Sequence, residues 1–292
     1  MPTVPVAPPL HRRRLLGRAL LLAPWAALAG CASTWPEVPP GAGSSSARQR
    51  LRESADAHGA SAWAALHDVN LAVDRLWSPA GGLAGPAEAR WLPAAGVIAM
   101  QSAVVDVRTG IWRRRGAADE VRSWRNGAAV TASEALATVS VLADLHRLLW
   151  LGPIAVAELP GAVNWAEPET LDGRRCDHLN LALVPGLGMA SADRLSLFID
   201  RDEGWLRRLR VSMSGLGKAG EFAEVDFAEH RRLHGVLWPM RCQANAPRRM
   251  GQPAPAWRLT ALDVNRGYAG EAIAGPAWTG LAAGAARPLL PG

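Results

Sequence analysis

The chain has 292 residues and a mass of 31.0 kDa, which allows one domain of ordinary size or two small ones. A hydrophobic fraction of 49% with 20% charged residues excludes disorder throughout the chain and a collagen-like fibre. The formal charge is +6, but residues 1–30 hold four arginines and no acid, so the rest carries only +2. So small a charge argues against nucleic acid as a partner.

Residues 1–30 have the pattern of an export signal. Arg12–Arg14 and Arg18 precede an apolar stretch, Ala19–Ala29, which falls short of the ~20 residues that span a bilayer. The sequence Leu28-Ala29-Gly30-Cys31 then resembles the bacterial lipobox. This resemblance implies cleavage before Cys31 and attachment of lipid to that cysteine. The alternative is an ordinary signal peptide that contains a cysteine.

The residue after the cysteine carries a further implication of the lipobox resemblance. It is Ala32, whereas aspartate there usually signals retention at the inner membrane. The resemblance therefore implies a lipid-anchored protein at the periplasmic face of the outer membrane. Arg12–Leu16 also resembles a twin-arginine signal, so the export route stays open.

Composition divides the remaining chain into three parts. Residues 31–46 are rich in Pro, Gly and Ser and are expected to form a flexible tether. Residues 47–268 carry the hydrophobic patterning of one domain. Residues 269–292 are rich in Gly, Ala and Pro and are expected to form a low-complexity tail.

The first part of the domain mixes helix and strand. A helix is expected over 47–57, ended by His58-Gly59, with a short helical piece near 61–66. Alternation in Val69–Val73 predicts a strand. Further strands are expected over the ranges 96–107, 111–115 and 121–131, the last folded at Asn126-Gly127.

The segment 133–151 is expected to be an apolar helix, capped by Ser133 and stopped by Gly152-Pro153. Its polar residues form one narrow stripe of Ser140, Asp144 and Arg147, and apolar residues cover nearly all the rest. A helix resting on one sheet needs a narrower apolar face, so this helix should be covered on two sides.

The second half reads as a run of short strands with tight turns. They are expected over the ranges 170–184 with a turn at Asp172-Gly173, 194–200, 205–213, 221–230, 236–243 after a turn near His234-Gly235, and 257–265. This spacing is typical of an antiparallel sandwich or barrel.

Three of these segments resemble parts of the LolA/LolB-like lipoprotein-localisation fold. They are the hairpin Leu195–Leu209, the strand–Gly–strand–Pro step Val225–Pro239 and the last strand Leu262–Asn265. The resemblance implies an α+β, mainly β fold: a half-open antiparallel β-barrel wrapping, or lidded by, an apolar helix. It also implies a cavity for acyl chains, without catalysis or cofactor. Candidate residues lining that cavity lie on the 133–151 helix: Leu136, Val139, Leu142 and Leu149.

Two motifs suggest other chemistry. The spelling GxGxxG at Gly215–Gly220 lacks the following helix that a dinucleotide site needs, so a hairpin loop is expected. His230 and His234 have a spacing that binds zinc on a helix, but this segment reads as a strand and turn with arginines between them. We therefore expect solvated loop histidines and no metal site.

Cys176 and Cys242 are the thiols left after acylation of Cys31. An oxidising periplasm favours a disulfide between them, whereas strand parity places the sulfurs on opposite faces of a sheet. Both possibilities stay open.

The leading hypothesis is thus a membrane-anchored, non-enzymatic protein that binds a hydrophobic or lipid ligand. A second hypothesis is a structural subunit of a cell-envelope complex, with an envelope protein as partner and a filled core. An envelope hydrolase would need an acid–base pair that the sequence does not suggest.

Overall fold

The computed structural model describes residues 43–78, 82–83, 85–104, 106–116, 119–157, 159–214, 222–245 and 255–290. Residues 38–292 form one compact unit with its own core, so this part is expected to fold without the preceding residues. The export signal, Cys31, Gly215–Gly220 and most of the 31–46 tether lie outside the described residues.

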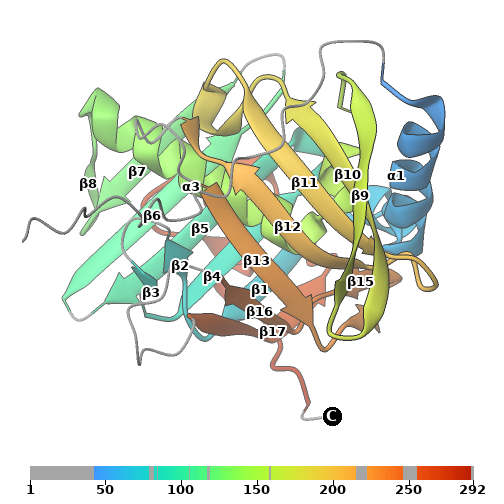
Figure 1. Ribbon diagram of the computed structural model, residues 1–292. Coiled ribbons are helices and arrows are strands. Elements are labelled where there is room, and N and C mark those ends of the chain that lie inside the picture. Colours follow the sequence, from blue (N-terminus) through green and yellow to red (C-terminus); the bar gives the residue numbers. More distant parts are fainter. Residues whose placement is uncertain are drawn as a thin grey trace, which may run out of the picture. The chain divides into compact units, whose positions relative to one another are not determined.

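One large antiparallel sheet dominates the unit (Figure 1). Its thirteen strands run in the order β8-β7-β6-β5-β4-β1-β17-β16-β13-β12-β11-β10-β9. Their bounds are β1 Val69–Val73, β4 Ala87–Leu92, β5 Val97–Val104, β6 Val107–Arg114, β7 Glu120–Arg125, β8 Ala128–Ala129, β9 Val163–Leu171, β10 Arg174–Leu183, β11 Asp193–Asp200, β12 Leu206–Ser212, β13 Phe222–Ala228, β16 Arg241–Ala244 and β17 Ala256–Val264. Two small ribbons accompany it, formed by β2 Trp77–Ser78 with β3 Gly82–Leu83 and by β14 Arg231–Leu233 with β15 Val236–Trp238.

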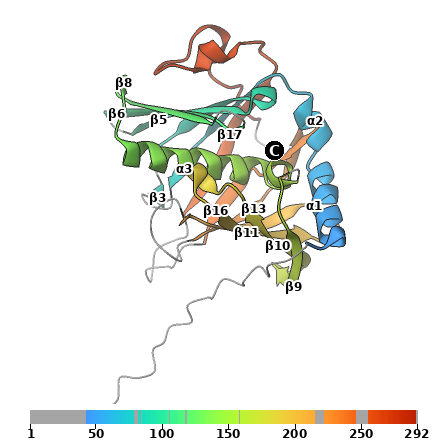
Figure 2. The same ribbon diagram turned by 90° about the horizontal axis from the view of Figure 1, so that it is seen from above.

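The helices lie inside and beside this sheet. They are α1 Ser45–Ala57, α2 Ala60–Ala64, α3 Ser133–Leu151 and α4 Pro153–Val156, with 3-10 turns η1 Pro93–Ala95, η2 Leu187–Met189, η4 Gly270–Ile273 and η5 Gly280–Ala283. Seen from above, α3 runs between the β5–β8 part of the sheet and the β10–β13 part (Figure 2). The sheet therefore bends around this helix.

The sheet is curved but not closed, because the order of its strands begins at β8 and ends at β9 without pairing these two edges. This confirms the expected half-open, mainly antiparallel β architecture around an apolar helix. Three sharp hairpin turns fall where Xaa-Gly pairs predicted them. Asn126, Asp172 and His234 have φ values of 49°, 47° and 53°, each followed by a glycine of positive φ, as tight two-residue hairpins require.

The sequence patterns missed β4 and most of β9, since the expected strand began at residue 170 and β9 begins at Val163. β4 follows a period-two pattern in which Ala87, Ala89 and Trp91 are buried, but alanine and glutamate favour strands poorly. The neighbouring hairpin also turns earlier than expected, since β5 ends at Val104 and β6 begins at Val107.

The concave face of the sheet holds the main core. Alternate residues of several strands, such as Leu179, Leu181 and Leu183 of β10, join α3 in one hydrophobic cluster. Within it Trp91 makes edge contacts with Trp63 and Trp150, at ring-centroid distances of 5.1 and 5.4 Å. These tryptophans thus serve as core packing.

The C-terminal segment differs from the expected low-complexity tail. Its described part, up to residue 290, folds over the convex face of β4–β6 in a second cluster that includes Tyr268, Ile273 and Ala282. The buried Arg90 guanidinium anchors the segment by donating to the carbonyls of Ala282 and Gly284 at 3.0 and 2.9 Å. Small residues pack closely against the sheet here, a role that composition alone does not reveal.

The ends of α3 fall where the sequence placed them, but the expected N-cap is wrong. Ala132 is the N-cap, and Ser133 is the first helical residue instead of the cap. At the other end Gly152 has φ 49°, and its N–H donates to the carbonyl of Leu148. Glycine tolerates this backbone conformation, which ends the helix before Pro153.

Candidate functional site

The interior site is organised by α3, whose two halves differ. From Ser140 to Leu151 every residue except Leu142 and Arg147 is buried, whereas residues 133–139 are exposed or half-buried. The C-terminal half is therefore core, and the N-terminal half lies at the open side of the concavity.

The four candidate lining residues fall into both halves. Leu149 is only 1% exposed and belongs to the core cluster. Val139 packs on the margin of that cluster, while Leu136 and Leu142 are half-buried outside it. The structure thus brings Leu149 into a packed interior and leaves the other three near the surface.

The polar stripe of α3 faces protein rather than solvent. Asp144 is 2% exposed and accepts from Arg113 Nε and Nη2, each at 3.4 Å. Its Oδ2 also accepts from the backbone N–H of Gly188 at 2.9 Å and pairs with Arg115 Nη1 at 3.2 Å. One carboxylate therefore ties the helix to β6 and to the η2 loop.

Sequence reasoning missed Arg113 and Arg115 as partners of this stripe. The available signal was the alternation of β6, in which Ile111 and Arg113 share the inward face. A charged residue on an inward face requires a buried counter-charge, and Asp144 was the one acid on the apolar helix beyond its first turn.

Arg147 completes the stripe and lines two adjoining cavities. One has a volume of about 300 Å³ and is bounded by α3, α4, the residues after β6 and the end of β10. The other, about 30 Å³, lies between α3, β4 and β5. Both are lined by Arg115, Asp144 and Arg147, so these three side chains lie between the two cavities.

Several buried polar atoms lack hydrogen-bond partners in the described part of the chain, and two of them lie beside Trp150. These two are Nε2 of His146 and Nε1 of Trp91, and both side chains contact Trp150. His146 Nδ1–H donates to the carbonyl of Leu142 at 2.9 Å. Burial lowers the pKa of His146 to about 4, because a charged imidazole loses its hydration there.

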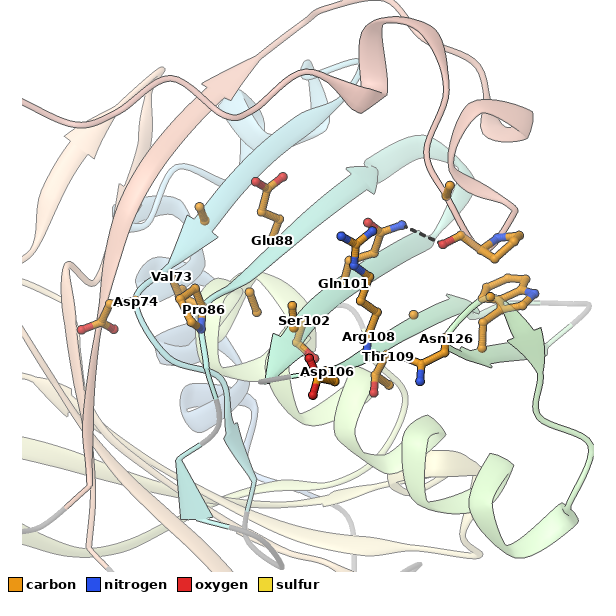
Figure 3. A pocket seen from close by; sticks show the side chains of 18 of the residues that line it. Val73, Asp74, Pro86, Glu88, Gln101, Ser102, Asp106, Arg108, Thr109 and Asn126 are labelled. Carbon is orange, nitrogen blue, oxygen red and sulfur yellow. Dashed lines mark hydrogen bonds between the residues drawn. The ribbon is translucent and has the colours of Figure 1, made fainter.

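A larger, open groove lies on the convex face. It has a volume of about 1080 Å³ and is floored by β4–β6 beside the C-terminal segment (Figure 3). Charged and polar side chains line much of it, among them Glu88, Asp106 and Arg108. At one end Gln101 donates to the carbonyl of Pro276 at 3.3 Å.

The two cysteines are free thiols in the structure. Cys242 belongs to the core cluster of the concave face, whereas Cys176 lies outside that cluster on a strand whose concave residues begin at Leu179. The disulfide that an oxidising periplasm would favour is therefore not formed. The physical reason is that the two side chains lie on opposite faces of the sheet.

The two histidines of the candidate zinc spacing, His230 and His234, lie in different surroundings. His234 is exposed, as expected, but His230 is half-buried against the Trp205 ring at 5.4 Å, so the expectation of a solvated loop histidine is wrong for His230. Burial, with His58 and Arg207, lowers the pKa of His230 to about 4. No group of three or more His, Cys, Asp or Glu residues suited to a metal ion occurs in the described ranges.

Among the residues that the structure describes, none of the helices combines the length and apolar character needed to cross a bilayer.

Comparison with known proteins identifies the fold. No protein-family model matches the chain, and no curated protein matches it. Several solved structures do match the chain. A DUF1329 family protein from Desulfovibrio piger and a LolA superfamily protein from Nitrosomonas europaea each share 12% identity with the chain, at TM-score 0.50, over 78% of this chain and 96% of theirs. An outer membrane lipoprotein-sorting protein domain from Vibrio parahaemolyticus has 8% identity and TM-score 0.48, covering 78% and 95%.

Proposed function

Because the chain has a LolA/LolB-like fold, we propose that it binds a hydrophobic or lipid ligand between α3 and the concave face of its sheet, without catalysis. One observation carries the proposal: a 19-residue apolar helix lies in the concavity of a sheet whose edges are not joined. The helix is not part of the strand ladder, so it can move without breaking strand pairing.

Ligand entry requires such a movement. The cavity between α3 and strands β4–β5 is about 30 Å³, whereas small-molecule sites typically have about 300–1,000 Å³. In the opened protein an acyl chain would take a place in the hydrophobic cluster that α3 shares with the leucines of β10–β12. Exchange of one apolar surface for another keeps the free-energy cost of opening modest.

The proposal includes a location. Acylation of Cys31 would hold the protein at the periplasmic face of the outer membrane, with residues 31–46 as the tether. Bacteria supplied with labelled palmitate should label the wild type, and the Cys31→Ser variant should carry no label. Label that survives this substitution would contradict the anchor.

Ligand binding can be tested with residues 38–292, freed of bound lipid and offered fatty acids, phospholipids and acylated peptides. Native mass spectrometry should show uptake of at least one class at one molecule per chain. Leu142→Gln should weaken uptake, whereas Glu134→Gln, at an exposed position on the same helix, should not. Absence of uptake from the whole panel would refute the proposal.

The second candidate function is the structural subunit of an envelope complex. The observation that favours it is the continuity of the core, because Val141, Leu145 and Leu149 of α3 belong to the same buried cluster as the sheet. Capture of one stoichiometric envelope protein by a chain that takes up no lipid would support this alternative.

A further inference from the structure

Arg113, Arg115 and Arg147 lie around Asp144, and Arg147 is the one of these three without a hydrogen bond or ion pair to the described residues. In the described part of the chain its guanidinium makes no hydrogen bond or ion pair, although it lines both cavities beside α3. Arginines in partly buried positions are normally paired, because desolvation of a charge is costly. A bound anion would therefore give the Arg147 guanidinium the partner that the described residues do not provide.

The neighbouring acids bond to other groups, although the charge of Asp144 still attracts Arg147. Both oxygens of Asp144 already accept from Arg113, and Oδ2 also holds Gly188 N–H and Arg115. Asp119 lies 3.8 Å from Arg113 Nη2. The guanidinium groups of Arg113, Arg115 and Arg147 thus face two carboxylates, those of Asp119 and Asp144. The group has a net charge of +1.

The charge is retained despite burial. Desolvation lowers the pKa of Arg147. The positive charge of Arg115 lowers it further, the carboxylate of Asp144 raises it, and Arg113 lowers it again. A guanidinium nevertheless stays protonated in proteins. The result is a positive potential directed into a pocket that Arg115, Asp119 and Asp144 also line. Its remaining walls are mostly apolar and include Leu148, Leu159 and Leu183.

We infer that Arg147 binds the acid group of an anionic amphiphile, a carboxylate or phosphate ester at the end of an alkyl chain. This inference rests on the proposed function and adds the chemical class of the ligand. A planar guanidinium suits both acid groups, because it can donate two parallel N–H bonds to either. The cavity of about 300 Å³ accommodates the head and the first part of the chain, and the remainder follows α3 inward.

The test compares laurate with lauryl alcohol, which share a chain and differ in charge, on residues 38–292 by calorimetry. Laurate should bind more tightly. Arg147→Met keeps much of the side-chain volume and removes the charge, so it should weaken laurate binding by about tenfold or more and leave lauryl alcohol unchanged. Arg125→Met, at an exposed position on β7, is the matched control and should change neither.

The outcomes separate the two proposals. If laurate and lauryl alcohol bind equally well to wild type and Arg147→Met, the lipid site stands and the role of Arg147 is overturned. If neither ligand binds, the proposed function itself fails. Binding of inorganic phosphate with the same dependence on Arg147 and no gain from an alkyl chain would also overturn the inference, because it would mark a site for small anions.

Stability without ligand provides an independent readout. An unpaired cation weakens the fold, so Arg147→Met should raise the melting temperature of the ligand-free protein. A lower melting temperature would assign Arg147 a structural role instead. Laurate should raise the melting temperature of the wild type more than that of the variant.

Discussion

At the scale of single residues, Leu149 and Leu136 lie on the same helix in different surroundings. Leu149 is 1% exposed in the main core, and Leu136 is half-buried outside it. Leu149→Ala should lower the free energy of unfolding by about 2–5 kcal/mol, because the cavity left in a packed core cannot fully collapse. Leu136→Ala should cost about 1 kcal/mol or less. Urea unfolding measures both, and equal losses would contradict the assignment of the two helix halves.

Buried histidines predict the dependence of stability on pH. The pKa values of His58 and His146 are lowered to about 4 from an unfolded value of 6.5. Between these pH values the unfolded chain binds more protons than the folded one, so stability is complete above about pH 6.5 and falls as the pH drops toward 4.

The contribution of His146 can be isolated. His146→Leu should lose less stability than the wild type between pH 7 and pH 4, by up to about 3 kcal/mol, since each pKa unit corresponds to about 1.4 kcal/mol. Chemical unfolding at several pH values measures the difference. Parallel curves for the two proteins across this interval would show that His146 is accessible to protons in the folded state.

At the scale of elements, the η2 loop holds α3 in place through Gly188. This residue has φ +61°, and a Cβ there would lie 2.6 Å from Val141 Cγ2 and 2.9 Å from the Val141 nitrogen. Gly188→Ala should therefore push the loop from the helix and destabilise the protein by about 1–3 kcal/mol. Hydrogen exchange in residues 133–151 should become faster.

The matched control is Gly173→Ala at the β9–β10 turn. Gly173 has φ +79°, but nothing lies within 4 Å of an added Cβ. This variant should show the cost of the backbone conformation alone, about 1 kcal/mol, with unchanged exchange in α3. Equal effects of the two variants on α3 would rule out the loop as its restraint.

Sequence patterns predicted elements better than contacts between them. The helix 133–151 was placed correctly because Gly152-Pro153 stops it and its apolar run is long, and the Xaa-Gly turns fixed three hairpins. The Arg113–Asp144 pairing and the covering of Arg90 by the C-terminal segment join residues far apart in sequence. Strand alternation marks Arg113 as an inward-facing charge that needs a partner, but no local pattern encodes the covering of Arg90, which emerged only from the folded structure.

At the scale of the whole molecule, the C-terminal segment is part of the fold. Truncation after Tyr268 would expose Trp112 and the second core cluster and deprive buried Arg90 of the carbonyls of Ala282 and Gly284. Loss of partners for a buried charge typically costs about 3–5 kcal/mol. Calorimetry should show a clearly lower melting temperature, and light scattering should show aggregation. An unchanged melting temperature would mean that this segment is dispensable.

The central claim is that the concave side of the sheet, beneath α3, receives the alkyl chain. A fatty acid carrying a diazirine at its chain end, photolysed in complex with residues 38–292 and mapped by peptide mass spectrometry, tests it directly. The account predicts saturable labelling within 133–151 and at inward-facing positions of β10–β12, competed by unlabelled fatty acid. Labels confined to the convex groove around Gln101 and Arg108, or labelling that does not saturate, would contradict it.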